Sequence, residues 1–316
     1  MDRVNIHKFN LLLLIHTIMT FVNKVKNVLS TRIYVINWIS IYISIRMKQP
    51  SDIHLRNGSV IKSVKDPYDV IRLMKAGYSV EVVGEKIVKV SKENLKILCR
   101  TQTGFDFGHI IEIFENKTYP VDLLNKVVID VGASNGDSSI FFWKNGASKV
   151  IGIEPMTESY ELANENIKIN RAENSIMILN AALSQYSGFI DLHVSSNNPN
   201  ANSISPTKAV RNSGIQYDEV RKIKSMTLEE IIDTYKVEEV GLLKMDCEGC
   251  EYDVLKNLSD EVFAKISNIR LEYHEGLQFL PEYLTSKGYV CNYQKSEGLG
   301  ILDASKIVEK GKPSIA

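Results

Sequence analysis

The chain has 316 residues, and its 38 Lys and Arg are balanced by 38 Asp and Glu, which gives a formal net charge of zero at pH 7. This balance provides no global positive field for a nucleic-acid backbone, so we expect no nucleic-acid partner. Hydrophobic residues make up 44% of the chain, enough for one large domain with an extension or for two domains. The cysteines are too few and too scattered for a disulfide framework, which favours a reducing, cytoplasmic location.

Residues 1–50 contain two apolar runs, Asn10 to Val22 and Ile33 to Ile45, separated by a basic stretch. Each run has about 13 residues, whereas a helix that spans a bilayer needs roughly 20. We therefore predict an apolar helical segment that does not cross a membrane. In the second run three aromatic residues recur every four positions, Tyr34, Trp38 and Tyr42. This stripe suits peripheral contact of residues 10–45 with the inner face of a membrane, or packing on the catalytic domain or a second subunit. The oligomeric state is not fixed by the sequence.

A small accessory α+β region is predicted over residues 51–125. His54 to Val64 contains an Asn-Gly pair, and Tyr78 to Val90 alternates around a glycine, so each indicates a hairpin. Asp66 to Gly77, which lies between them, predicts a short helix that ends at Gly77. Such segments commonly cap an active site, but this one carries no catalytic motif.

The main domain is predicted over residues 126–305, with a tail at 306–316. Val127 to Val131 is an apolar, β-branched run suited to a strand buried on both faces, and the glycines after it let the chain turn sharply into a helix. A strand, turn and helix in this order open a nucleotide-binding α/β unit. The dinucleotide fingerprint G-x-G-x-x-G is not matched, because Ser134 and Asp137 replace its second and third glycines.

Electrostatics favour a different adenosine cofactor for this turn. Asp130 and Asp137 would repel a pyrophosphate, which disfavours a dehydrogenase. S-adenosylmethionine (SAM) carries an ammonium and a sulfonium, which an acid at the strand end favours, and a carboxylate, which backbone N–H groups of the turn can receive. We therefore predict SAM as cofactor. The binding residues predicted in this segment are Asp130, Gly132, Ser134, Asn135 and Gly136.

The next two predicted strands add to the cofactor site. Lys149 to Pro155 is a buried strand that ends at Glu154, 22 positions after Gly132. In nucleotide-binding units an acid about 20 residues after the glycine turn binds the ribose diol. Glu154 therefore indicates a cofactor with an adenosine part, but it does not distinguish SAM from the others. Ser175 to Leu183 is the third strand, and its small residues leave room for an adenine ring. The residues predicted here are Glu154, Pro155, Asn180 and Ala181. The alternative is a parallel sheet without nucleotide.

Between the third and fourth predicted strands lie an extra strand, a loop and a helix. Gly188 to Ser195 has the composition of a strand, and Ser195 to Pro206 is dense in Asn, Ser and Pro and predicts a loop. The loop is either a lid over the acceptor or a solvated loop without a role. Thr227 and Glu230 have the spacing of a capping box, so a helix begins there.

A second chemical centre follows the fourth predicted strand, Gly241 to Met245. Asp246 stands at the carboxyl end of this strand, where open α/β sheets bind ligands, and Glu251 falls in the first turn of the next helix. Together with Glu248 these acids are predicted to lie at the site of methyl transfer. In the alternative interpretation Glu251 interacts with the helix dipole and Glu248 with solvent.

The segments DVGASNG, IEP, NAALS, SMTLEEI and LLKMDCEGCE, taken together, resemble the FkbM-type family of SAM-dependent methyltransferases. The resemblance covers Val127 to Ala304 and implies methylation of hydroxyl groups, often on sugars or polyketide-type natural products. It also implies a cofactor site at Asp130, Gly132 and Glu154, and an acidic motif near the methyl group at Asp246, Glu248 and Glu251. The chain departs from many relatives at Ser134, where they carry Asn.

Cys247 and Cys250 have the spacing C-x-x-C inside this acidic motif. A structural zinc site needs four ligands, and the sequence has no second pair of this kind. We therefore predict that both cysteines are packing residues.

Methylation of an alcohol requires a general base or a metal ion beside the acceptor. Ser267 to Gly276 is predicted to be a strand beside the one that ends at Asp246, about 4.8 Å away, and His274 lies at its end. His274 is the preferred base, with Asp246 orienting it or the acceptor; a structural histidine is the alternative. An Mg²⁺ ion held by Asp246, Glu248 and Glu272 is the less favoured option, and no metal site is predicted.

These observations predict an α/β class I methyltransferase, Rossmann-like, with a seven-stranded, mostly parallel sheet and helices on both faces. Tyr289 to Gln294 and Leu299 to Ala304 should complete the sheet as an antiparallel pair. The expected reaction is O-methylation of a sugar hydroxyl in a glycan or glycolipid. The alternatives are methylation of a non-sugar natural product and a non-catalytic SAM-binding or membrane-associated scaffold subunit. Methylation of nucleic acid is disfavoured because no D-P-P-Y motif follows the fourth strand.

Overall fold

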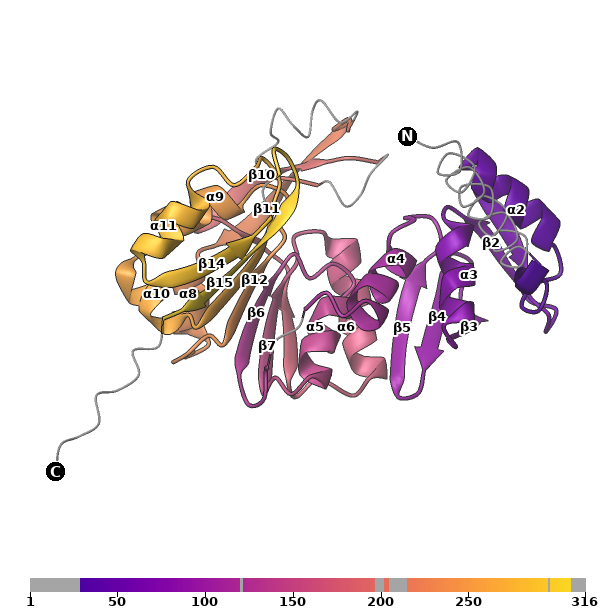
Figure 1. Cartoon of the computed structure of the whole chain (residues 1–316), viewed down its shortest axis with the longest axis horizontal. Coiled ribbons are helices and arrows are strands. Elements are labelled where there is room, and N and C mark those ends of the chain that lie inside the picture. The colour runs from indigo at the N-terminus through magenta and orange to yellow at the C-terminus, as the bar shows by residue number, and fades with distance from the viewer. Residues whose placement is uncertain (1–28, 120–121, 197–201, 205–214, 295, 308–316) are drawn as a thin grey trace, which may run out of the picture. The chain divides into compact units, whose positions relative to one another are not determined.

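The computed structural model describes residues 29–119, 122–196, 202–204, 215–294 and 296–307 (Figure 1). The chain forms two compact units, of which the first comprises Met1–Leu95 with Cys99–Ile111 and the second comprises Lys96–Leu98 with Glu112–Ala316. The finer limits between residues 1–50, 51–125 and 126–305 remain predictions.

The first unit contains the two predicted hairpins. β1 (Ser51–His54) pairs with β2 (Val60–Val64) across the Asn-Gly turn, where Gly58 has a φ of +88°. β3 (Ser79–Val82) pairs with β4 (Ile87–Lys92). A further strand that the sequence did not predict, β5 (Leu95–Arg100), joins this second hairpin in a three-stranded sheet. Both hairpins are therefore confirmed.

The short helix between the hairpins is also confirmed. α3 (Pro67–Lys75) begins after Asp66, whose side chain accepts hydrogen bonds from the backbone N–H groups of Tyr68 and Asp69. Gly77 follows its end with a φ of +91°, a conformation that glycine adopts without steric cost. The short helices α4 (Asp106–Ile110) and η1 (Ile111–Glu115) were not predicted.

The helix expected over Ile33 to Ile45 begins later than predicted. α2 spans Trp38–Met47, and before it Val35 forms an antiparallel bridge with Leu55. Tyr34 therefore does not continue a helical stripe through Trp38. An extended backbone is favoured over a helix here because it forms inter-strand hydrogen bonds to the segment that contains β1. In one of these bonds the Ile36 N–H donates to the His54 carbonyl oxygen at 2.8 Å.

The apolar side chains of α2 divide between a buried and an exposed set. Ile41 is buried, whereas Ile39, Ile43 and Met47 are each more than half exposed. The other predicted run, Asn10 to Val22, lies outside the described residues. No helix in the described part of the chain is long and apolar enough to span a membrane. Peripheral membrane contact of residues 10–45 stays a prediction.

The second unit is built on a seven-stranded sheet with the order β14-β15-β13-β12-β6-β7-β8. The strands from β13 to β8 pair in parallel, and β15 is antiparallel to both β13 and β14. The predicted mostly parallel sheet with a terminal antiparallel pair is confirmed. Its strands are β6 (Val127–Val131), β7 (Lys149–Ile153), β8 (Ile176–Leu179), β12 (Leu242–Met245), β13 (Asn268–Tyr273), β14 (Tyr289–Tyr293) and β15 (Gly300–Lys306).

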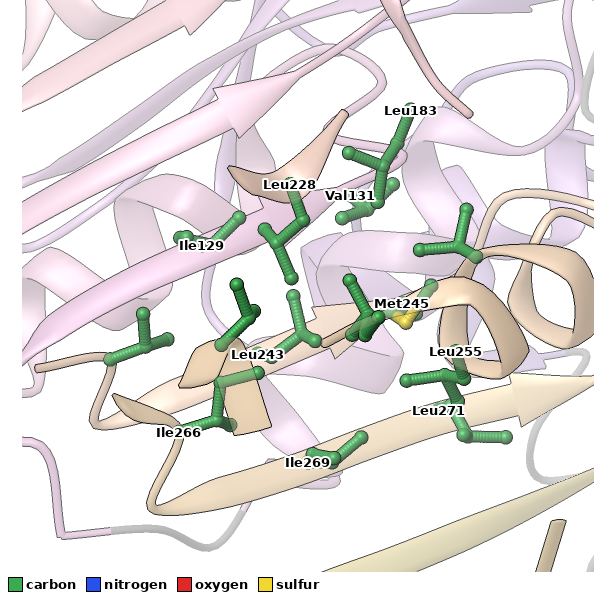
Figure 2. Packing of buried hydrophobic residues seen from close by; sticks show 14 of the residues in the cluster. Ile129, Val131, Leu183, Leu228, Leu243, Met245, Leu255, Ile266, Ile269 and Leu271 are labelled. Atoms are coloured by element: carbon green, nitrogen blue, oxygen red, sulfur yellow. The ribbon is translucent and has the colours of Figure 1, made fainter. Parts of the chain in front are cut away.

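Helices cover both faces of this sheet. Ile129 and Val131 of β6 pack in one apolar cluster with side chains of α8, α9, α10 and α11, of which Figure 2 shows Leu228 and Leu255. Asp130 alternates with them and points to the opposite face, where side chains of α5 contact it. The helices are α5 (Asp137–Lys144), α6 (Thr157–Ile169), α8 (Leu228–Thr234), α9 (Glu251–Asn257), α10 (Asp260–Lys265) and α11 (Leu280–Ser286).

A separate small sheet follows β8. The strand expected over Ser175 to Leu183 is interrupted: β8 ends at Leu179, and β9 (Ala182–Leu183) pairs with β11 (Glu219–Met226) instead. β10 (Gly188–Val194), which was predicted, pairs with β11 in antiparallel register. The loop Ser195 to Pro206 is described only in part, so its role as a lid stays a prediction.

Candidate active site

The predicted site residues meet at the carboxyl edge of the seven-stranded sheet. Val131 at the end of β6 pairs with Met245 at the end of β12, which places Gly132 beside Asp246. β13 pairs with β12 on its other side and brings His274 to the same edge. Ligands of open α/β sheets bind at this edge.

The acidic motif forms a tight turn between β12 and α9. Glu248 has a φ of +55° and Gly249 a φ of +110°, so two consecutive residues are left-handed. The carboxylate of Glu251, which is fully buried, accepts hydrogen bonds from the backbone N–H groups of Cys247 at 3.0 Å and Gly249 at 2.9 Å. Both of its oxygens therefore hold the turn, and the catalytic role of Glu251 stays a prediction.

Cys247 and Cys250 are joined by a disulfide bond, with their Cα atoms 5.5 Å apart. The prediction that they are separate packing residues was wrong. The spacing C-x-x-C is compatible with packing and with a disulfide, and the turn between the two cysteines here places their Cα atoms within bonding range. Cysteine use therefore no longer favours a reducing compartment.

His274 lies among the carboxylates of the turn. Its Nε2 atom is 3.3 Å from Glu248 Oε2 and 4.0 Å from Asp246 Oδ1, and its Nδ1 atom is 3.4 Å from Glu251 Oε1. Burial by itself lowers the pKa of His274, but the contact with Glu251 and the surrounding negative charges outweigh it and raise the pKa to about 9. His274 is therefore an imidazolium at neutral pH.

Two glutamates that interact electrostatically with His274, Glu248 and Glu272, have raised pKa values. Burial raises the pKa of Glu248 to about 7, and nearby acids add to the effect while His274 opposes it. The pKa of Glu272 is also raised to about 7, first by burial and then by the charge of Asp246. A carboxyl group with a pKa near 7 can exchange protons at physiological pH.

Part of this cluster also has the geometry of a metal site. Asp246, Glu248 and His274 each offer one ligand atom, and among the described residues these atoms lie within 4.8 Å of one another. The Mg²⁺ site considered from the sequence combined Asp246 and Glu248 with Glu272, whereas the structure combines them with His274. The basic side chains that contact these carboxylates are His274 and Lys244.

Lys244 is a site residue that the sequence analysis missed. It is buried within β12, and its Nζ atom lies 3.3 Å from Asp130 Oδ1 and 3.7 Å from Asp246 Oδ2. It also donates hydrogen bonds to the carbonyl oxygens of Val131 at 3.1 Å and Gly132 at 2.9 Å. Burial lowers the pKa of Lys244, but Asp130 and its other neighbours more than offset this and raise it, so the lysine stays charged.

This ion pair gives Asp130 a structural role in addition to the predicted one. The Asp130 carboxylate is fully buried and accepts hydrogen bonds from the hydroxyls of Ser138 at 2.7 Å and Ser139 at 2.6 Å. Lys244 balances its charge inside the protein, and Asp130 ties β6 to α5 through the two serine hydroxyls. A contact of Asp130 with the cofactor stays a prediction. The sequence signal for this ion pair is a lysine in an otherwise apolar strand, because a buried charge needs a partner of opposite charge.

The glycine turn is packed tightly against the acidic turn. Gly132 has a φ of +76°, and a Cβ atom at this position would lie 1.9 Å from the carbonyl oxygen of Asp246. The N–H groups of Gly132 and Ala133 both donate to the Ile153 carbonyl, at 3.0 and 3.1 Å. These two N–H groups are thus already bonded within the protein, and binding of a cofactor carboxylate by N–H groups of the turn stays a prediction. Asn135 is buried, and its side chain accepts from the Asp137 N–H at 3.3 Å.

Glu154 is held in place at the end of β7. Its carboxylate accepts hydrogen bonds from the N–H groups of Ser134 at 2.9 Å and Met156 at 2.8 Å. An acid at this position, about 20 residues after the glycine turn, is where adenosine-binding α/β units bind a ribose diol. Asn180 donates to the carbonyl oxygens of Glu154 at 3.0 Å and Pro155 at 3.2 Å. Together with the glycine turn and the buried Ala181, these residues fit an adenosine-bearing cofactor.

The strand order, with the antiparallel β15 between β13 and β14, defines a class I, Rossmann-like methyltransferase fold. The family model of the methyltransferase FkbM domain matches residues 130–291, about half of the chain. The chain therefore belongs to the FkbM methyltransferase family and is a methyltransferase, as the sequence motifs implied.

The chain is also similar to individual proteins. It is 25% identical to methyltransferase sdnD of Sordaria araneosa over 214 residues, which cover 59% of this chain and 83% of the relative. The crystal structure of methyltransferase FkbM from Methylobacillus flagellatus KT shares 16% identity and a TM-score of 0.41, covering 60% of this chain and 46% of that one. The structure of M. capricolum TrmK with S-adenosyl-homocysteine shares 12% identity and a TM-score of 0.35, covering 60% and 68%.

Proposed function

We propose that this methyltransferase uses SAM and methylates a hydroxyl group, with a sugar of a glycan or glycolipid as the acceptor. The observation that carries the proposal is the cluster of Asp246, Glu248 and His274 at the carboxyl edge, directly beside the glycine turn. An alcohol oxygen must lose its proton to attack a methyl group, and this cluster contains a group that can take it.

The cofactor is proposed to bind between the glycine turn and the end of β7. Glu154 is placed to accept hydrogen bonds from ribose hydroxyls, and the turn at Gly132 lets the ligand approach the backbone closely. Ala181, a small buried residue after β8, leaves space for the adenine ring. When bound, the cofactor supplies an electrophilic methyl group on its sulfonium.

We assign the role of general base to Glu248 instead of His274. A base must be unprotonated, and His274, with its pKa raised to about 9, carries its proton at neutral pH. Glu248, with a pKa of about 7, is substantially ionised there. In this scheme Glu248 accepts the hydroxyl proton as the acceptor oxygen bonds to the methyl carbon. His274 holds the Glu248 carboxylate in place, and the partly exposed Asp246 orients the acceptor.

A groove beside the acidic turn supports a hydroxyl-rich acceptor. It has a volume of about 460 Å³ and lies between the β10–β11 hairpin and α9. Two exposed aromatic side chains, Tyr186 and Phe189, line it and offer flat surfaces of the kind that stack on sugar rings. The polar side chains that line it, and can hydrogen-bond to hydroxyls, include Asp191, His193, Lys222 and Asp253.

The test is a screen of glycans and glycolipids with the full chain and SAM. Turnover is measured as the formation of S-adenosylhomocysteine (SAH). With an accepted sugar, Glu248→Gln should lower turnover by about 10²- to 10⁴-fold, the usual contribution of a general base. Glu261→Gln, a change of an exposed acid on α10, is the matched control and should leave turnover unchanged. If the cofactor binds but no hydroxyl acceptor leads to SAH formation, the non-catalytic alternative is favoured. If only a non-sugar alcohol is turned over, a sugar is excluded as the acceptor.

A further inference from the structure

We propose that Cys247 and Cys250 form a reversible dithiol–disulfide site that holds the catalytic turn when oxidised and releases it when reduced. The inference rests on the proposed function in one respect, because it treats Glu248 as the residue that the turn must position. The disulfide lies inside the acidic motif rather than at the periphery of the fold, and the two residues that it encloses are Glu248 and Gly249.

The enclosed residues have the backbone conformation that most needs support. Glu248 has a φ of +55°, in the left-handed region that residues other than glycine rarely adopt. Such a conformation persists only where the surroundings over-determine it. The surroundings here are the disulfide, the Glu251 carboxylate on the N–H groups of Cys247 and Gly249, and the hydroxyl of Ser203, which donates to the Glu248 carbonyl oxygen.

The held conformation is the one that brings Glu248 to His274. The ion pair between Glu248 Oε2 and His274 Nε2 is 3.3 Å long, so a change in the backbone at Glu248 moves the carboxylate out of contact. Opening the disulfide removes the covalent restraint and leaves only hydrogen bonds to hold a left-handed glutamate. In the reduced chain Glu248 is free to return to a right-handed conformation, in which its carboxylate no longer faces the acceptor.

The bond is accessible to a thiol. Its exposed end is Cys247, which is half-buried, whereas Cys250 is only 2% exposed at the wall of the groove of about 460 Å³ beside α9. A dithiol reductant, either a small molecule or a protein, attacks the Cys247 sulfur as a thiolate; the S–S bond breaks and Cys250 leaves as a thiolate that takes up a proton. The second thiol of the reductant then displaces Cys247. The reductant is oxidised to its disulfide, and the cysteine pair gains two electrons and two protons.

The test compares the full chain in its oxidised state and after reduction by dithiothreitol. Alkylation and mass spectrometry count the thiols, and hydrogen exchange reports the amides of Cys247 and Gly249. We expect reduction to make both cysteines alkylatable, to speed exchange at Gly249 by about tenfold, and to lower methyl transfer by about the same factor. The affinity for SAH should change by less than about twofold, because the glycine turn and Glu154 are not part of the bridge.

Two variants separate the bridge from the other thiols. Cys99→Ala/Cys291→Ala keeps the pair and should respond to the reductant as the wild type does. Cys247→Ala/Cys250→Ala should be insensitive to it and resemble the reduced wild type. If full reduction of the wild type changes neither amide exchange nor turnover, the proposal is wrong. If no hydroxyl is methylated in either state while the exchange response is present, the proposed function fails and the redox site stands.

Discussion

Replacement of Lys244 by methionine should destabilise the second unit strongly. The side chains of Lys244 and Asp130 are 4% and 0% exposed, and they form an ion pair at 3.3 Å. Methionine keeps the apolar length of lysine but leaves the Asp130 carboxylate charged and buried, with only two serine hydroxyls as partners. Removal of one member of a buried ion pair costs about 3–5 kcal/mol. That is a large fraction of the roughly 5–15 kcal/mol by which a protein domain is stable.

The assay is equilibrium unfolding in urea, followed by tryptophan fluorescence. The chain has two tryptophans, Trp38 and Trp143, and Trp38→Phe leaves Trp143 of α5 as a reporter of the second unit. In this background Lys244→Met should lower the free energy of unfolding by about 3–5 kcal/mol. Lys256→Met, a change of an exposed lysine on α9, is the control and should cost about 0.5 kcal/mol or less.

A double variant tests whether the charge left behind is the cause. Asp130→Asn together with Lys244→Met removes both charges, so it should be more stable than the sum of the two single effects by at least about 1 kcal/mol. A cost below about 1 kcal/mol for Lys244→Met alone, or strict additivity in the double variant, would refute the assignment of this pair.

Three further predictions concern the site. Gly132→Ala would place a Cβ atom 1.9 Å from the Asp246 carbonyl oxygen in a backbone with a φ of +76°, so the affinity for SAH should fall by about tenfold or more in titration calorimetry; unchanged affinity contradicts the geometry. The pH profile of kcat/KM should rise through about 7, as Glu248 loses its proton and becomes a base, and fall through about 9, as His274 loses the proton that balances it. A flat profile between pH 5 and 10 would exclude this pair. Turnover should persist in EDTA, and a loss that Mg²⁺ restores would instead assign a metal ion to the cluster.

Much of the fold could be predicted because its signals are local. Val127 to Val131 is a strand with the predicted limits, since a β-branched run ended by a glycine turn leaves little choice. The side chain of Thr227 accepts from the Glu230 N–H at 3.0 Å, as the capping-box spacing indicated. The interruption after Leu179 was not predicted, because Ala182 and Leu183 pair with β11, which follows about 40 residues later in the sequence.

The limits of prediction at the site have a common physical origin. Asp246, Glu248 and His274 were identified from their positions at strand ends, and the structure brings them together. Their protonation states depend on distances and burial, which a sequence does not contain. The sequence names His274 as the base, whereas we propose Glu248. It missed both the pairing of Lys244 and the disulfide.

Cofactor binding is tested most directly by isothermal titration of the full chain with SAM, SAH and NAD. We expect SAM and SAH to bind and NAD not to bind. Glu154→Gln should weaken both affinities, because Gln removes a negatively charged acceptor of ribose hydroxyls. Binding of NAD alone, or no binding of any adenosine ligand to the folded chain, would contradict SAM as the cofactor.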